Sequence, residues 1–111
     1  CSSDLLHFTG GYDHNYVLGR PGEKKIMANA YCRESGIALE AETDCCGVQF
    51  YAGNFIGEQT GKGGAAYHDR SAFCLESQFY PNAVNEPDFP SPVVKAGHTY
   101  HTETSYRFYL R

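Results

Sequence analysis

Residues 73–85, with the sequence FCLESQFYPNAVN, decide the fold of this chain. The first half is rich in residues that favour strands, and the proline that follows ends the strand because it cannot donate a hydrogen bond to a β-ladder. Successive side chains of a strand point to opposite faces, so Glu76 and Gln78 share one face and Phe73 lies on the other. If Phe73 faces a core, the carboxylate and the amide line a second surface, and this combination suits a polyhydroxylated ligand.

Short runs of the same kind recur along the chain between clusters of Gly, Pro, Asn and Asp, and no segment has helical periodicity over a useful length. The pattern predicts an all-β fold with about seven strands. We expect these strands over residues 12–18, 25–33, 37–43, 48–51, 72–78, 93–96 and 99–110, with loops over the glycine-rich residues 57–64 and the proline-rich residues 80–92.

The strands over residues 25–33 and 37–43 flank a Glu-Ser-Gly turn, which predicts an antiparallel hairpin. In the second of them, Ile37, Leu39 and Ala41 alternate with two glutamates. A strand with this alternation is typical of a sheet with one buried and one solvated face. We therefore expect the three apolar side chains to be buried and the glutamates to face water.

The composition excludes several classes of function. No apolar run approaches the roughly 18 to 20 residues that span a bilayer, and the mean hydropathy is -0.47, so we expect no membrane partner. Nine Lys plus Arg against thirteen Asp plus Glu give a net charge of -4. A chain without a basic stripe is poorly suited to phosphate backbones, and we expect no nucleic-acid partner.

The five cysteines are odd in number and have no C-x-x-C spacing, which fits neither a disulfide framework nor a zinc ribbon. We therefore expect reduced thiols and a cytoplasmic location. Free cysteine is commonly a small buried hydrophobe, and we expect this of Cys32 and Cys74. The adjacent Cys45 and Cys46 precede a glycine in a turn, and a redox-active pair is an open alternative for them.

Three motifs follow one another along the chain. They are GYDHNYVL at residues 11–18, CGVQFYAGN at residues 46–54 and the stretch at residues 73–85. Together they make the chain resemble the galactose mutarotases, or aldose 1-epimerases, and several matches spread over one chain arise by coincidence far less often than a single one. Lesser matches lie at residues 61–65, 85–90, 97–100 and 106–108.

The resemblance implies an all-β fold of a particular kind, a large antiparallel β-sandwich of the galactose mutarotase type. Members of this family are much longer than 111 residues, and the present sequence starts at Cys1 rather than Met, with no charged-then-apolar leader. We therefore expect residues 1–111 to form a single partial domain, the C-terminal portion of the sandwich of a longer enzyme.

The resemblance also implies an activity. Enzymes of this family interconvert the α and β anomers of a free aldohexose such as galactose or glucose: a base takes the C1 hydroxyl proton, an acid protonates the ring oxygen, and the ring opens and closes on the other face. No metal or redox cofactor is required. Glu76 matches the catalytic base of the family. Asp13 and Gln49 match residues that hold the sugar hydroxyls, a task that suits carboxylates and amides.

Aromatic and histidine side chains near these motifs extend the hypothesis. An aromatic face often covers the C–H surface of a sugar, and Tyr12, Phe50 and Tyr80 are the candidates for this role. His14 follows Asp13 directly, and neighbours in a strand point to opposite faces. We therefore do not expect the imidazole of His14 to share a pocket with the Asp13 carboxylate.

The chain departs from the family at one decisive point. The family's general acid is a histidine, assisted by a second histidine and an arginine, and all three lie upstream of anything that aligns here. We therefore expect little or no turnover by the isolated chain. No metal site is expected, since His98 and His101 are three apart in a strand-like run and so lie on opposite faces. A smaller departure is Cys46, where the family commonly has proline.

Two other functions stay open. The chain could be a non-catalytic carbohydrate-binding β-sandwich that uses Asp13, Gln49 and Glu76 only to hold sugar, or it could be a structural β-domain of a larger assembly. Sugar affinity without anomer exchange would favour the first of these, and the absence of both would favour the second. The sequence does not decide which hexose is preferred or what the oligomeric state is.

Overall fold

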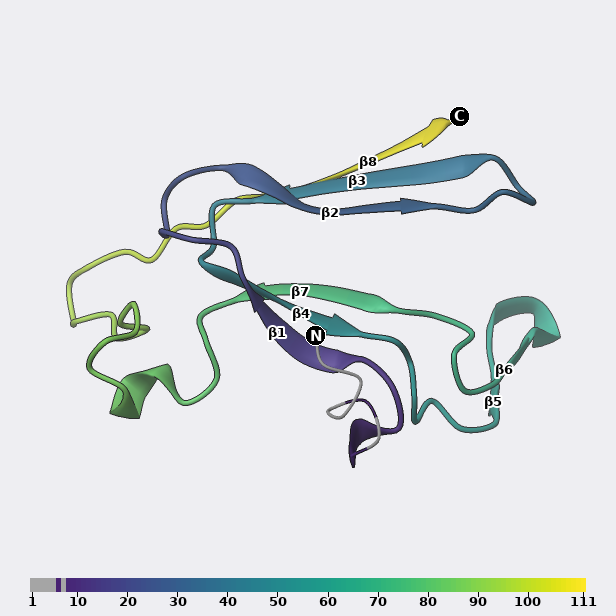
Figure 1. The fold of residues 1–111 in the computed structure, drawn as a ribbon, viewed down its shortest axis with the longest axis horizontal. Helices are drawn as coiled ribbons and strands as arrows, with labels where there is room; N and C mark the ends of the chain where they lie inside the picture. The colour runs from purple at the N-terminus through teal and green to yellow at the C-terminus, as the bar shows by residue number, and fades with distance from the viewer. Residues whose placement is uncertain (1–5, 7) are drawn as a thin grey trace. The chain divides into compact units, whose positions relative to one another are not determined.

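The structure, a computed structural model, describes residue 6 and residues 8–111. It contains eight β-strands and two short 3-10 helices (Figure 1). The predicted all-β fold is confirmed. No helix within these residues is long and apolar enough to cross a membrane. The strands are β1 (Asp13–Val17), β2 (Lys25–Tyr31), β3 (Ile37–Thr43), β4 (Gly47–Tyr51), β5 (Gln59–Thr60), β6 (Ala66–Tyr67), β7 (Cys74–Gln78) and β8 (Thr104–Leu110), and the helices are η1 (Lys62–Gly64) and η2 (Ala83–Asn85).

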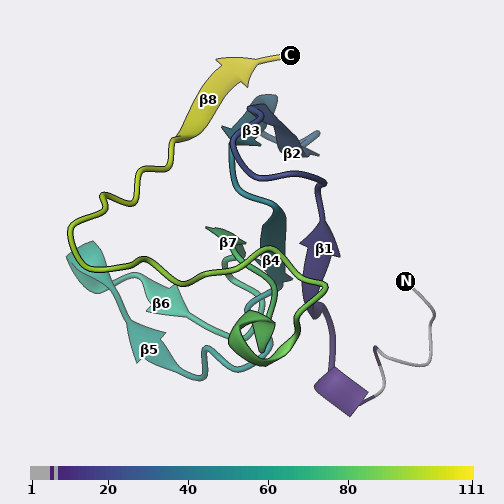
Figure 2. The ribbon, with the colours of Figure 1, turned by 90° about the vertical axis from the view of Figure 1, so that its left-hand side faces the viewer.

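The strands form three sheets. One has the order β1-β4-β7, a second has the order β2-β3-β8, and the third is the pair β5-β6. The two short strands of the third sheet lie side by side in both ribbon views (Figure 2). The chain divides into two compact units, one of Cys1–Asn15 with Gln49–Glu76 and the other of Tyr16–Val48 with Ser77–Arg111.

The hairpin predicted from the Glu-Ser-Gly turn is confirmed. β2 and β3 pair antiparallel, and β8 pairs antiparallel along the other side of β3. In the turn, the Gly36 N–H donates to the Cys32 carbonyl and the Cys32 N–H donates to the Ile37 carbonyl, both at 2.9 Å. Gly36 has a φ of 70°, a left-handed conformation that glycine adopts without steric cost.

The burial of β3 differs from the simple alternation that the sequence predicted. Ala41 is fully buried as expected, but Ile37 is 49% exposed and its neighbour Ala38 is only 2% exposed. Ala38 pairs with Tyr31 on one side and with Tyr109 on the other. Directly paired residues share a face of the sheet, so two large side chains flank and shield this small one. Ile37 lies at the first position of the strand, beside the turn, where less of the chain covers it.

The two glutamates of β3 are half-buried and paired rather than freely solvated. Glu40 lies 3.8 Å from the Arg107 guanidinium, and Glu42 lies 3.9 Å from the Lys24 ammonium. The Ser105 hydroxyl also donates to Glu42 at 3.3 Å. Ion pairs at this level of exposure contribute little to stability, so these contacts order the polar face of the sheet more than they stabilise it.

The predicted strand over residues 93–96 is wrong, and the last strand begins only at Thr104. A turn occupies part of this region. The His98 N–H donates to the Lys95 carbonyl at 3.0 Å, and Gly97 has a left-handed φ of 83°. The backbone hydrogen bond of Lys95 and His98 thus closes a turn instead of joining a strand ladder. The two valines of residues 93–96 have high strand propensity, but no strand forms there.

A small hairpin replaces the loop that was expected over residues 57–64. β5 and β6 pair antiparallel around η1. A Cβ placed on Gly61 would lie 2.1 Å from the ring of Tyr67. The glycine therefore allows the aromatic ring to pack directly on the backbone at the residue that follows β5.

The burial predicted for Cys32 and Cys74 is wrong. Cys32 and Cys74 are exposed, whereas Cys45 and Cys46 are buried, and all four are free thiols. Cys32 lies at the hairpin turn and Cys74 begins β7, which is at the edge of its sheet. Positions at a turn and at a sheet edge have fewer neighbours to cover them, which the residue type alone does not reveal. Cys1 lies outside the described residues.

Asp44, directly after β3, holds the segment that precedes β8. The Thr102 hydroxyl donates to its Oδ1 at 2.5 Å, and the Glu103 N–H donates to the same oxygen at 2.9 Å. The bond from the Thr102 hydroxyl, followed by that from the Glu103 N–H, holds the pKa of the Asp44 carboxyl below its usual value.

This shift predicts a pH-dependent contribution to stability. Because the folded-state pKa is below the unfolded value of about 3.9, the Asp44 carboxylate stabilises the fold above that pH, and the contribution is lost as the pH falls through the folded-state pKa. Asp44→Ala should therefore lower the urea midpoint at pH 7, and the difference from the unsubstituted protein should shrink below about pH 4. Asp88→Ala, at an exposed loop position, is the control and should show little change. A deficit for Asp44→Ala that is the same at pH 7 and pH 3 would contradict the assignment.

Candidate functional site

The three residues that the sequence singled out come from three neighbouring strands. Asp13 is the first residue of β1, Gln49 is the middle residue of β4, and Glu76 is the middle residue of β7. The strand order places β4 between the other two, as Figure 1 shows. All three residues belong to the same compact unit.

The structure brings two of these side chains into direct contact. The Gln49 Nε2 amide donates to Asp13 Oδ1 at 2.7 Å. A carboxylate only accepts hydrogen bonds, so this contact fixes the orientation of the Gln49 amide group. Its other atom, Oε1, is buried and has no hydrogen-bond partner among the described residues. The bond uses one oxygen of Asp13 and leaves the second available to a donor such as a ligand hydroxyl.

Glu76 lies on β7, the strand next to the one that carries Gln49. Alternation along β7 places its side chain on the face opposite that of Phe73 and Leu75, as the sequence predicted. The residue is exposed, and its carboxylate makes no hydrogen bond or ion pair with another residue that the structure describes. Its oxygens are therefore open to a hydrogen bond from an incoming molecule.

Aromatic side chains occupy the other face of the same strands. The ring of Tyr12 lies 6.1 Å from that of His14 and 5.5 Å from that of Phe50, and the ring of Phe50 lies 6.2 Å from that of Phe73. Since Tyr12 and His14 flank Asp13 in the sequence, alternation puts the aromatic row opposite the Asp13 carboxylate. His14 and Asp13 thus point to different faces, as predicted.

This arrangement bears on Tyr12 and Phe50, two of the three rings that the sequence offered for sugar stacking. Tyr12 and Phe50 contact each other on the aromatic face, so the structure does not bring either ring to the surface that carries Asp13 and Gln49. Tyr80 belongs to the other compact unit, where its ring packs against Phe89 at 5.2 Å. Sequence proximity to the motifs suggested Tyr12 and Phe50, but the alternation of side chains along a strand decides which face they occupy.

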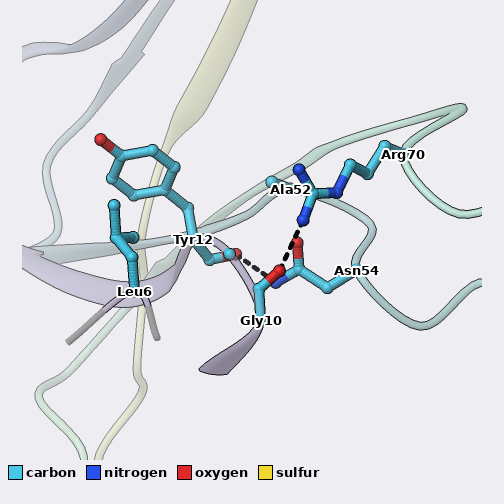
Figure 3. A pocket seen from close by; sticks show the side chains of 7 residues that line it. Leu6, Gly10, Tyr12, Ala52, Asn54 and Arg70 are labelled. Carbon is cyan, nitrogen blue, oxygen red and sulfur yellow. Dashed lines mark hydrogen bonds between the residues drawn. The ribbon is translucent and has the colours of Figure 1, made fainter. Parts of the chain in front are cut away.

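The turn before β1 is held by three residues to which the sequence assigned no role, Ala52, Asn54 and Arg70 (Figure 3). The Tyr12 carbonyl accepts from the Ala52 N–H at 2.9 Å and from Asn54 Nδ2 at 3.0 Å. The Arg70 guanidinium donates to the Gly10 carbonyl at 2.6 Å. The side-chain contacts join segments 42 and 60 residues apart in the sequence. The only local signal for them is the Gly-Asn pair that follows β4.

An open cavity of about 330 Å³ lies beside this turn. No group of three or more His, Cys, Asp or Glu side chains within the described part of the chain is arranged to hold a metal ion. The residues that line the cavity are Leu6, Gly10, Gly11, Tyr12, Ala52, Asn54 and Arg70.

Comparisons with known proteins agree on one group of enzymes. The model of the aldose 1-epimerase family matches residues 2–107. The galactose mutarotase of Sus scrofa is 46% identical over 99 residues, and that of Homo sapiens is 44% identical over 99 residues. The aldose 1-epimerase of Escherichia coli (strain K12) is 35% identical over 101 residues.

Each of these alignments covers 88% of the chain. The chain spans about 29% of the length of the curated relatives it matches. The family model extends over nearly all of the sequence, including the three strands that carry Asp13, Gln49 and Glu76. The chain therefore belongs to the aldose 1-epimerase family.

Proposed function

We propose that this chain supplies the sugar-binding surface and the base of an aldose 1-epimerase that acts on free aldohexoses such as galactose and glucose. The observation that carries the proposal is the 2.7 Å bond between Gln49 on β4 and Asp13 on β1, in the sheet where β4 lies next to the strand of Glu76. Together with membership of the family, it supports a role for these three residues in one site.

In this proposal Asp13 and Gln49 hold the hydroxyls of the sugar. The Gln49 amide occupies one oxygen of Asp13, so the carboxylate accepts the next hydrogen bond through its other oxygen. A carboxylate bound in this way is held in a defined orientation, which lowers the entropy lost when a hydroxyl binds to it. The pair is expected to bind the ground state and the transition state of the sugar equally well, so its loss should raise KM rather than lower kcat.

Glu76 acts as the base. Its carboxylate takes the proton of the C1 hydroxyl while an acid protonates the ring oxygen, and the C1–O ring bond breaks to give the open aldehyde. Rotation about the bond from C1 to C2 then exposes the other carbonyl face to the ring hydroxyl. Closure returns the proton from Glu76 to the C1 oxygen and the ring proton to the acid, so the reaction is balanced without an external reagent.

The acid is supplied from outside the 111 residues in this proposal. Each positioned proton-transfer group contributes about 10² to 10⁴ in rate. The isolated chain, with a base but no matched acid, is thus expected to be slower than a complete enzyme by at least about 10².

A hybrid enzyme tests this division of roles. In it, the 99 residues of this chain that align with the Sus scrofa galactose mutarotase replace the matching segment of that enzyme. We expect polarimetry of freshly dissolved α-D-galactose to show rapid anomerisation with the hybrid enzyme and almost none with the isolated chain. A folded hybrid that binds galactose without anomer exchange would favour the non-catalytic binding function. Equally rapid anomerisation by the hybrid and by the isolated chain would place the acid within these 111 residues and contradict the proposal.

A further inference from the structure

We propose that Asn54 is a positioning residue for Asp13. It donates a hydrogen bond to the carbonyl of Tyr12, the residue directly before Asp13, and so holds the Asp13 carboxylate against Gln49. This inference rests on the proposed function, because it assigns Asn54 to the sugar-binding pair.

The carbonyl of Tyr12 is the point of contact. It accepts two hydrogen bonds, from the Ala52 N–H at 2.9 Å and from Asn54 Nδ2 at 3.0 Å. Ala52 and Asn54 directly follow β4, the strand that carries Gln49. The segment after one strand therefore fixes the start of the other, and the two strands joined in this way carry the partners of the 2.7 Å bond.

The amide of Asn54 is buried at some cost. The residue is only 6% exposed, and its Oδ1 has no hydrogen-bond partner among the described residues. An unpaired buried acceptor destabilises a fold, so an apolar residue of similar size would suit a purely structural role better. The Nδ2 group is the part of the side chain that makes a bond, and that bond is directed at the Tyr12 carbonyl.

The turn is shaped to admit this amide. Gly11 has a φ of 149°, and a Cβ placed on it would lie 2.2 Å from Asn54 Oδ1. Arg70 holds the preceding residue through the bond from its guanidinium to the Gly10 carbonyl. Figure 3 shows both hydrogen bonds converging on the turn from the same side. Asn54 thus bonds the residue next to Asp13, whereas Arg70 bonds a residue farther from Asp13 in the chain.

A double-substitution cycle tests the inference, because it separates action through Asp13 from a general loss of stability. The variants Asn54→Ala, Asp13→Ala and the combination are made in the hybrid enzyme, and KM and kcat for α-D-galactose are measured by polarimetry. We expect Asn54→Ala to raise KM about tenfold with little change in kcat, as for lost uniform binding. In the Asp13→Ala background, the same substitution should change KM by less than about twofold, since residues that act as a unit are not additive.

Two further variants keep the test decisive. Asn54→Asp preserves the size of the side chain but replaces the donor that faces the Tyr12 carbonyl with an acceptor, so it should raise KM even if Asn54→Ala fails to fold. Asn29→Ala, at an exposed position of β2, is the control and should leave KM unchanged.

The outcomes distinguish the inference from the function on which it rests. If Asp13→Ala raises KM but the Asn54 variants do not, the positioning role is wrong and the proposed function stands. The inference is also overturned if Asn54→Ala raises KM equally with and without Asp13. If Asp13→Ala itself leaves KM unchanged, the assigned sugar-binding role of Asp13 fails, and the positioning role fails with it. For a hybrid that binds without turnover, the equilibrium Kd of galactose replaces KM in the same comparison.

Discussion

Glu76→Gln in the hybrid enzyme is expected to lower kcat for the anomerisation of α-D-galactose by about 10²- to 10⁴-fold. Glutamine has nearly the shape of glutamate, but its amide cannot take the proton of the C1 hydroxyl. The exposed carboxylate of Glu76 makes no hydrogen bond or ion pair with another described residue, so the substitution breaks no bond that supports the fold. The loss should therefore appear in kcat and not in the midpoint of unfolding.

A matched substitution controls for the change in charge. Glu23→Gln removes one negative charge at an exposed position before β2 and should leave kcat within about twofold of the unsubstituted hybrid, because surface substitutions away from a site have small effects. A Glu76→Gln variant that retains more than a tenth of the original kcat would remove Glu76 from the role of base.

Gly53→Ala is expected to lower the free energy of unfolding by about 3 kcal/mol. Gly53 has a φ of 69°, and a Cβ at this position would lie 2.3 Å from the Ala72 carbonyl oxygen and 2.8 Å from the Ile56 side chain. The left-handed φ of a non-glycine residue costs about 1 kcal/mol or more. Forcing a methyl group into occupied space typically costs about 1–3 kcal/mol in addition, and the obstructing atom here belongs to the backbone.

Gly57→Ala separates these two costs. Gly57 has the same φ of 69°, but a Cβ there would meet no atom within 4 Å. We expect it to lose only about 1 kcal/mol. Urea denaturation of the hybrid enzyme, followed by circular dichroism, measures both variants. Equal losses would show that the approach of residue 53 to residue 72 is looser than the structure indicates.

The sequence predicts the regular part of the fold well and its edges poorly. β3 occupies the residues that were expected for it, because alternation and a glycine turn are local signals. The strand expected over residues 93–96 does not form, since high strand propensity is insufficient without a partner strand. β5 and β6 are two residues long each and leave no periodicity to detect. Ala38 is buried by cross-strand tyrosines, a tertiary effect.

In the candidate site, too, local sequence signals predicted some residues, and residues that act through tertiary contacts were missed. Asp13, Gln49 and Glu76 were proposed from motifs, and the contact between the first two is present in the structure. Strand parity, applied to the sequence, also separated His14 from Asp13. Asn54 was missed because its bond to the Tyr12 carbonyl spans 42 residues and involves a backbone acceptor. Such a contact depends on how two strand ends meet in the fold, and it cannot be predicted from the residue types at either end.

The most direct test of the central claim is the galactose Kd of the Glu76→Gln hybrid enzyme, measured by isothermal titration calorimetry. If Glu76 is the base while Asp13 and Gln49 hold the sugar, this variant should bind galactose within about twofold of the unsubstituted hybrid although its turnover is lost, as expected for a group that acts chiefly in the transition state. A loss of affinity that matches the loss of turnover would show that Glu76 holds the sugar instead, and would contradict the assignment of base and binding surface made here.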